Sequence, residues 1–206
     1  MTDIKYTIHP VFPKPIYRTF LKKKLTKKDI QYANNIRLRH KNEGNTNSRN
    51  SYILNGKHFN KLKIELENIV KNYVDNVICP QYNIKPYITQ SWFNYTSPNE
   101  YHHKHAHSNS MLSGVLYFTA DPTFDSIIFS CNRYLPISIE KKSYNLYNSE
   151  TWKFSVQSNQ VILFPSDLMH QVEMKKGNNL RISLAFNVFF KGKLGNRDSL
   201  TELIIK

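Results

Sequence analysis

The stretch His102-His103-Lys104-His105-Ala106-His107 places four histidines within six residues, and one more ends the distant stretch Phe164-Pro165-Ser166-Asp167-Leu168-Met169-His170. Imidazole is the commonest metal ligand in proteins because it offers a neutral nitrogen near neutral pH. A local His-x-His pair completed by a distant histidine is typical of non-haem metal sites in β-rich proteins. The sequence therefore predicts a β-rich fold built around a metal.

Strand geometry selects among these histidines. Alternate side chains of an extended segment share one face, so His103, His105 and His107 are expected to point one way, with His102 excluded. His170 would arrive from another strand and leave positions open for substrate and oxygen. A solvated polar turn with histidines that bind nothing is the alternative. The cluster together with the distant histidine favours a metal site.

After Pro80 the sequence consists of short β-type runs, namely Ile88–Tyr95, Gly114–Thr119, Ser126–Ser130, Val161–Phe164, Gln171–Met174 and Leu180–Phe190. Strands that follow helices and are separated by turns indicate an antiparallel sandwich with helices packed outside. The last two runs flank a polar segment, residues 175–179, which predicts a hairpin turn. Residues 132–159 are too many for a turn and are expected to cover or gate a site. The aromatic residues of this insertion either line a substrate groove or only pack it: Tyr134, Tyr144, Tyr147 and Trp152.

The N-terminal part has a different pattern. Closely spaced prolines in residues 9–20 predict an extended edge segment. Thr26 is a candidate N-cap for a helix to about His40, followed by a loop over residues 42–47. The i, i+3, i+4 spacing of apolar residues predicts an amphipathic helix over residues 59–78.

Composition excludes several classes of protein. The 206 residues fit one domain, and 40% hydrophobic content excludes a disordered chain. No run of eighteen apolar residues occurs, so we expect no membrane partner. The N-terminus has no apolar stretch of signal-peptide length, which predicts a cytoplasmic protein. Cys79 and Cys131 are then expected to be buried thiols, with a secreted, disulfide-bridged protein as the alternative.

The net charge of +14 raises the question of nucleic-acid binding. The lysines are dispersed, however, apart from residues 22–24 and 27–28. Non-specific attraction to acidic partners is the expected consequence.

The strand after the predicted hairpin carries an arginine on a polar face. Arg181, Ser183 and Asn187 share one face, whereas Ile182, Leu184 and Phe186 share the other. If helices cover the apolar face, the polar face lines the interior, where an arginine is costly unless it holds an anion. A guanidinium suits a carboxylate, which it binds through two hydrogen bonds. Alternatively, Arg181 lies on a solvated face and pairs with Glu173.

These motifs together carry a family resemblance. The chain resembles the iron(II)/2-oxoglutarate-dependent oxygenases in the order of its motifs. These motifs are Tyr95, His105-Ala106-His107, Ser113-Gly114-Val115-Leu116-Tyr117-Phe118, Phe164-Pro165 to His170 and Arg181-Ile182-Ser183. The most similar branch carries His-x-His, Ser-Gly-Val-x-Tyr and Phe-Pro-Ser-x-x-x-His, and the segment Phe12–Tyr17 is similar to it as well. The resemblance implies a mainly β fold, a double-stranded β-helix (jelly roll) with N-terminal helices packed outside. It also implies one domain over residues 1–206. The N-terminal extended segment and helices would occupy residues 1–80, and the jelly-roll core would occupy residues 81–192 with an insertion at 132–159. Residues 193–206 would form a C-terminal tail.

The resemblance also implies roles for individual residues. His105 and His170 match the two histidine ligands of Fe(II), and Arg181, with Ser183 beside it, matches the arginine that pairs with 2-oxoglutarate. Tyr95 and Tyr117 match tyrosines that contact this co-substrate. The wider superfamily carries Asp or Glu two residues after the first histidine, where this chain has His107. This departure implies either a three-histidine iron site or a need for another ligand, for which Asp125 and Asp167 are the candidate carboxylates. If the segment is not a regular strand, His103 takes the place of His107.

The implied activity is that of a hydroxylase that releases succinate and carbon dioxide. Its substrate would be a peptide, a nucleic acid or a small molecule, and assembly as a homodimer is left open. Two alternatives remain: a cupin-like metalloprotein that needs no keto acid, and a non-catalytic binding protein on the same fold.

Overall fold

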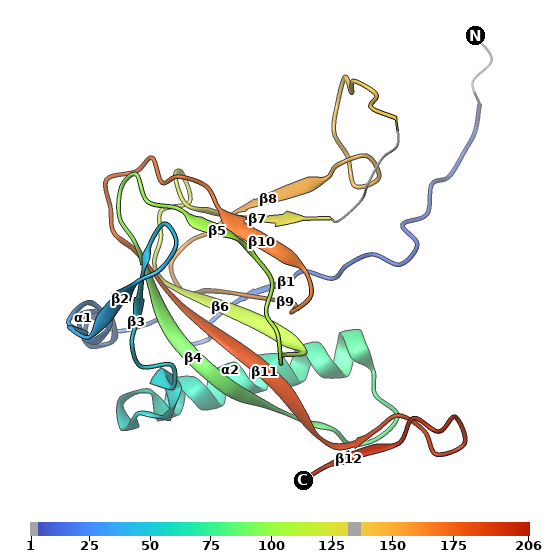
Figure 1. Cartoon of the computed structure of the whole chain (residues 1–206), viewed down its shortest axis with the longest axis horizontal. Helices are drawn as coiled ribbons and strands as arrows, with labels where there is room; N and C mark the ends of the chain where they lie inside the picture. Colours follow the sequence, from blue (N-terminus) through green and yellow to red (C-terminus); the bar gives the residue numbers. More distant parts are fainter. Residues whose placement is uncertain (1–3, 132–136) are drawn as a thin grey trace.

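The computed structural model describes residues 4–131 and 137–206. Its strands form two antiparallel sheets that face each other, and helix α2 (Asn60–Tyr73) lies along the outer side of the larger sheet (Figure 1). The expected fold class is confirmed: the chain is mainly β, a double-stranded β-helix with N-terminal helices outside.

The two sheets differ in size. The larger sheet has the order β1 (Tyr17–Phe20), β9 (Gln160–Pro165), β6 (Leu112–Thr119), β11 (Arg181–Leu194), β4 (Lys85–Thr96), β3 (Thr46–Ser48) and β2 (Arg39–Lys41), and β12 (Leu203–Ile205) pairs with β11. The smaller sheet has the order β5 (His102–His105), β10 (Met169–Val172), β7 (Ser126–Ser130) and β8 (Thr151–Ser155). Strand β1 confirms the predicted edge segment over part of its length.

The helices largely follow the prediction. Helix α1 (Lys27–Asn34) begins with a capping box. The Thr26 side chain accepts a hydrogen bond from the Asp29 backbone N–H, and the Asp29 carboxylate accepts one from the Thr26 backbone N–H. It ends well before His40, because the chain turns into the β2–β3 hairpin. Helix α2 continues through a π-helical turn, η3 (Val74–Ile78), and two short 3₁₀ turns precede it, η1 (Ile53–Asn55) and η2 (Lys57–Phe59).

Alternation along β11 separates two hydrophobic layers. Ile182, Leu184 and Phe186 are buried in the outer layer, together with Leu66 and Val70 of α2. The intervening residues face the space between the sheets, where a second apolar cluster includes Tyr117, Ile127, Phe129, Ile162 and Phe164. The predicted division of β11 into an apolar outer face and a polar inner face is therefore confirmed.

The predicted hairpin after β10 is wrong. Strands β10 and β11 lie in different sheets, and the segment between them crosses from one sheet to the other. Lys175 in this crossing is anchored from both sides: its N–H donates to Glu100 O, and its carbonyl accepts from Asn99 N–H. Its ammonium lies 3.0 Å from the Asp125 carboxylate, and both side chains are only 1% exposed. The turn composition of residues 175–179 indicates a reversal of the chain but cannot distinguish a hairpin from a crossing between sheets.

The cysteine prediction is also wrong. Cys79 and Cys131 are both exposed and unbridged. Across the residues that the structure describes, no helix has the length and apolar character of a membrane span.

Gly114→Ala should destabilise the protein. A Cβ at this position in β6 would collide with the ring of Phe186, which is fully buried. Overpacking of this kind costs about 1–3 kcal/mol. Urea denaturation followed by circular dichroism would measure the change. Gly56→Ala is the matched control, since its Cβ would meet only Ile53 O at 3.3 Å. Equal stability of the two variants would contradict the packing described here.

Lys175→Met should cost about 3–5 kcal/mol, because it leaves the buried carboxylate of Asp125 without its counter-charge. Lys153→Met removes a lysine from an exposed pair with Glu173 and should change stability by no more than about 1 kcal/mol. Thermal unfolding of both variants in one buffer compares them. A cost for Lys175→Met no larger than the control's would show that the buried pair does not hold the crossing.

Candidate metal centre

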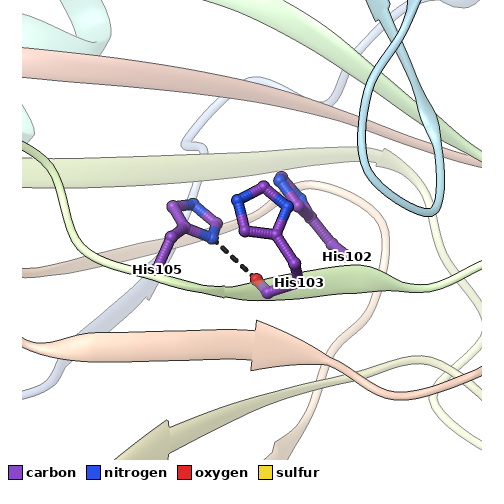
Figure 2. A group of neighbouring side chains, drawn as sticks. All are labelled: His102, His103 and His105. Carbon is purple, nitrogen blue, oxygen red and sulfur yellow. Dashed lines mark hydrogen bonds between the residues drawn. The ribbon is translucent and has the colours of Figure 1, made fainter.

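A β-bulge in β5 arranges the histidine cluster. His105 lies opposite His170 on β10, and His102 lies opposite Val172, so three steps along β5 match two along β10. The extra residue turns His102 to the same face as His105. Figure 2 shows the rings of His102, His103 and His105 over one side of the strand. The exclusion of His102 by simple alternation is therefore wrong.

Three histidines converge from two segments, and we call His105, His107 and His170 the inner histidine set. One nitrogen of each lies within 4.8 Å of the others. The ring centroids of His105 and His170 are 4.3 Å apart. His107 follows β5, and its backbone N–H donates to Ser166 O at 2.9 Å. The structure thus brings together all three histidines expected as ligands.

Backbone carbonyls fix the tautomers of two of these rings. His105 Nδ1 lies 2.8 Å from His103 O, and His170 Nδ1 lies 3.0 Å from Leu168 O. A carbonyl oxygen only accepts, so both Nδ1 atoms carry the proton and both Nε2 atoms keep a free lone pair. This arrangement is how proteins orient imidazole ligands towards a metal.

Burial keeps these histidines neutral. Desolvation lowers the pKa of His107 to about 4 and that of His170 to about 3, and burial also lowers the pKa of His105. Near pH 7 the rings are therefore uncharged, which is the form that binds metal ions.

The two candidate carboxylates lie elsewhere. Asp125 is held by Lys175, and Asp167 is exposed and pairs with Lys14 at 2.7 Å. Within residues 4–131 and 137–206, every close group of metal-binding side chains consists of histidines alone. The residues present therefore offer an ion three neutral nitrogens in place of two histidines and a carboxylate.

Arg181 is buried and forms no ion pair with the described residues, although the Asp125 carboxylate is close enough to raise its pKa slightly against the effect of burial. It is 2% exposed, and its guanidinium donates to Ser126 O at 3.3 Å and to Thr96 Oγ1 at 3.2 Å. Its Nε has no hydrogen-bond partner. Glu173, the acidic partner considered from the sequence, pairs instead with Lys153. Desolvation lowers the pKa of Arg181, but a guanidinium stays charged in proteins. A buried cation of this kind is costly unless an opposite charge compensates it.

One narrow cavity of about 40 Å³ joins the histidines to Arg181. His170 lies opposite Phe129 on β7, and Arg181 contacts Ser126 on the same strand. Phe129 and Ser126 are three residues apart, which is about 10 Å along the strand. Tyr117 and Ser183 both line the cavity, as do Trp92, Asn94 and His102. Burial raises the pKa of Tyr117 to about 12, so its hydroxyl keeps its proton.

Tyr95 is not brought to this cavity. It points to the outer face of β4, where its hydroxyl donates to Ala33 O at 2.7 Å and Arg39 lies 3.6 Å from its ring centroid. The sequence analysis also missed Trp92, Asn94 and His102 as cavity residues, and it missed His102 because the position of that ring depends on the bulge.

A second, more open cavity of about 390 Å³ lies beside the site. It is lined by Phe129 and Leu168 from the inner apolar cluster and by Trp152 from the predicted insertion. The Phe129 ring centroid is 6.2 Å from that of His170, so this cavity borders the inner histidine set. Tyr147 donates to Ile8 O, and Tyr134 lies outside the described residues.

Comparisons with known proteins agree with this geometry. The family model described as "Putative 2OG-Fe(II) oxygenase" matches residues 90–187, which include the inner histidine set and Arg181. No curated protein matches the sequence. The fold is similar to that of solved structures with low sequence identity.

Three solved structures illustrate the likeness. A 2OG-Fe(II) oxygenase family oxidoreductase from Burkholderia pseudomallei has 11% identity and a TM-score of 0.55, covering 83% of each chain. HygX from Streptomyces hygroscopicus, solved with nickel, 2-oxoglutarate and hygromycin B, has 12% identity and a TM-score of 0.58, covering 85% of this chain and 82% of its own. A Pseudomonas putida prolyl-4-hydroxylase has 11% identity and a TM-score of 0.51, and the match covers 84% of this chain and 92% of the hydroxylase chain. The family model thus matches 98 of the 206 residues, and these three solved structures share the fold of the chain.

Proposed function

We propose that this protein is an iron(II)- and 2-oxoglutarate-dependent oxygenase that acts as a hydroxylase. The observation that carries the proposal is the pairing, in one cavity, of three neutral histidines with a buried arginine that has an unused donor. His105, His107 and His170 would hold the iron. The free Nε2 atoms of His105 and His170 support this assignment.

Arg181 would bind the far carboxylate of 2-oxoglutarate. The Thr96 hydroxyl and the Ser126 carbonyl accept from the two terminal nitrogens of the guanidinium, whereas Nε has no partner among the described residues. Arg181 and the inner histidine set line the same cavity, so one small keto acid would reach from the ion to the guanidinium. Ser183 and Tyr117 also line this cavity and would offer hydroxyl donors to the co-substrate.

The exchange of a carboxylate for His107 changes the electrostatics. Three neutral imidazoles leave the full 2+ charge of the ion uncompensated by the protein. The dianionic co-substrate would then supply negative charge both to the ion and to the cationic Arg181. We therefore expect the ion and 2-oxoglutarate to strengthen each other's binding.

Bound iron(II) and 2-oxoglutarate would supply the oxidising chemistry, in which oxygen and the keto acid yield succinate and carbon dioxide while a substrate C–H becomes C–OH. The protein's own part is to orient the co-substrate and to exclude water, through Arg181 and the apolar walls around Phe164 and Ile127. The wider cavity beside Phe129 and Trp152 is the proposed place for the substrate, whether peptide, nucleic acid or small molecule.

Arg181→Ala tests the co-substrate assignment. Titration of the iron-loaded protein with 2-oxoglutarate under anaerobic conditions should produce a visible charge-transfer band in the unchanged protein. Loss of one partner of a buried charge pair costs about 2 kcal/mol or more, so the variant should bind 2-oxoglutarate at least about thirtyfold more weakly. Arg197→Ala, which changes an exposed arginine, should bind it normally.

The same experiment separates the rival functions. Full activity of Arg181→Ala without any keto acid would indicate a cupin-like metalloprotein. Iron binding without a band and without succinate in air would indicate a binding protein on this fold.

His105→Ala and His170→Ala should each abolish tight iron binding, because each removes one of three neutral ligands. Elemental analysis after anaerobic loading and desalting would measure bound iron per chain. His40→Ala, which removes an exposed histidine on β2, should retain the ion. Equal iron content in all three variants would rule out the inner histidine set as the site.

A further inference from the structure

We propose that His102, His103 and His105 form a second site for a divalent transition metal, which shares His105 with the inner histidine set and therefore competes with it. We call these three residues the outer histidine set. One nitrogen of each lies within 4.8 Å of the others, and the ring centroids are 4.5–5.2 Å apart. Figure 2 shows all three rings over the same side of β5.

Each of the three rings keeps a lone pair on Nε2. His105 donates through Nδ1 to His103 O, and His103 Nδ1 lies 3.4 Å from Glu43 O. His102 Nε2 lies 3.1 Å from Asn42 Nδ2, and an amide nitrogen only donates, so this Nε2 is an acceptor. An ion could replace the Asn42 donor and collect three imidazole nitrogens after small rotations of the rings. The bulge creates this site, because regular alternation would turn neighbouring histidines to opposite faces.

Glu43 is placed as a supporting partner. Its carboxylate lies 3.9 Å from His103 Nδ1, the nitrogen that would not bind the ion. A carboxylate behind a histidine fixes the ring and makes it a stronger ligand. The side chains of His103 and Glu43 are 30% and 67% exposed, so the outer set opens towards solvent beside the β2–β3 hairpin. Three imidazoles and one water fit the tetrahedral preference of zinc.

Competition follows from the shared ring. The proton on His105 Nδ1 leaves only Nε2 for coordination, so one ion at a time can use His105. An ion in the outer set would therefore withdraw a ligand from the inner set. The binding of an ion by the outer set stands by itself, whereas its inhibitory effect rests on the proposed function.

Cobalt(II) titration of the metal-free protein, followed by visible absorption, tests the proposal. The unchanged protein should bind one equivalent. His107→Ala/His170→Ala disables the inner set and should still bind one equivalent, more weakly. Adding His103→Ala to this variant should abolish binding, and adding His40→Ala instead should leave it unchanged. Glu43→Gln in the same background should weaken binding about tenfold.

Two results would overturn the proposal. The first is the absence of cobalt binding by the folded His107→Ala/His170→Ala variant, with folding checked by circular dichroism. The second is the binding of two equivalents by the unchanged protein, which would show that the sites do not share His105. If the double variant fails to fold, His107→Ala alone replaces it, and His103→Ala in that background must then remove the residual binding. Failure of the proposed function would appear separately, as normal cobalt binding without a 2-oxoglutarate charge-transfer band.

Discussion

The pairing of β5 with β10 is the constraint on which the site depends. It joins two strands that are distant in sequence and places His105 directly opposite His170. The one-residue bulge in this pairing then decides which further histidines reach the interior. A shift of register by one residue would turn the histidines away from the cavity, since side chains alternate between faces. The chemistry proposed for the protein is thus set by the register of a four-residue strand.

A second constraint comes from charge in the interior. Among the described residues Arg181 forms no ion pair of its own, because the one carboxylate that acts on it, Asp125, is already paired with Lys175. A protein gains no stability from an uncompensated buried cation. The Asp125–Lys175 pair therefore stabilises the fold, whereas Arg181 would receive its counter-charge from the proposed co-substrate. The same reasoning explains why Ser126 and Thr96 hold the guanidinium with neutral groups, which leave its charge available.

The sequence predicted those features that depend on local periodicity. The amphipathic pattern of α2, the N-cap at Thr26 and the two-faced pattern of β11 all follow from side-chain spacing, and they place the helices outside and Arg181 inside. The features that it did not predict depend on long-range pairing. Whether residues 175–179 form a hairpin or a crossing depends on which strands are neighbours, and the orientation of His102 depends on a bulge defined by β10. Tyr95 matches a family position in sequence, yet its side chain lies on the outer face of β4 against Ala33 and Arg39.

The distance in sequence between β5 and β10 also has a kinetic consequence. Strand pairs that close long loops form slowly, because the entropy of closure is lost before the contacts are made. The two strands pair over only a few residues, and β5 lies at the edge of the smaller sheet. An ion that binds across them would favour only the closed arrangement and so add its binding free energy to that of folding. The metal-free chain should then open first at this edge, and amide hydrogen exchange in β5 should be faster than in the central strand β11.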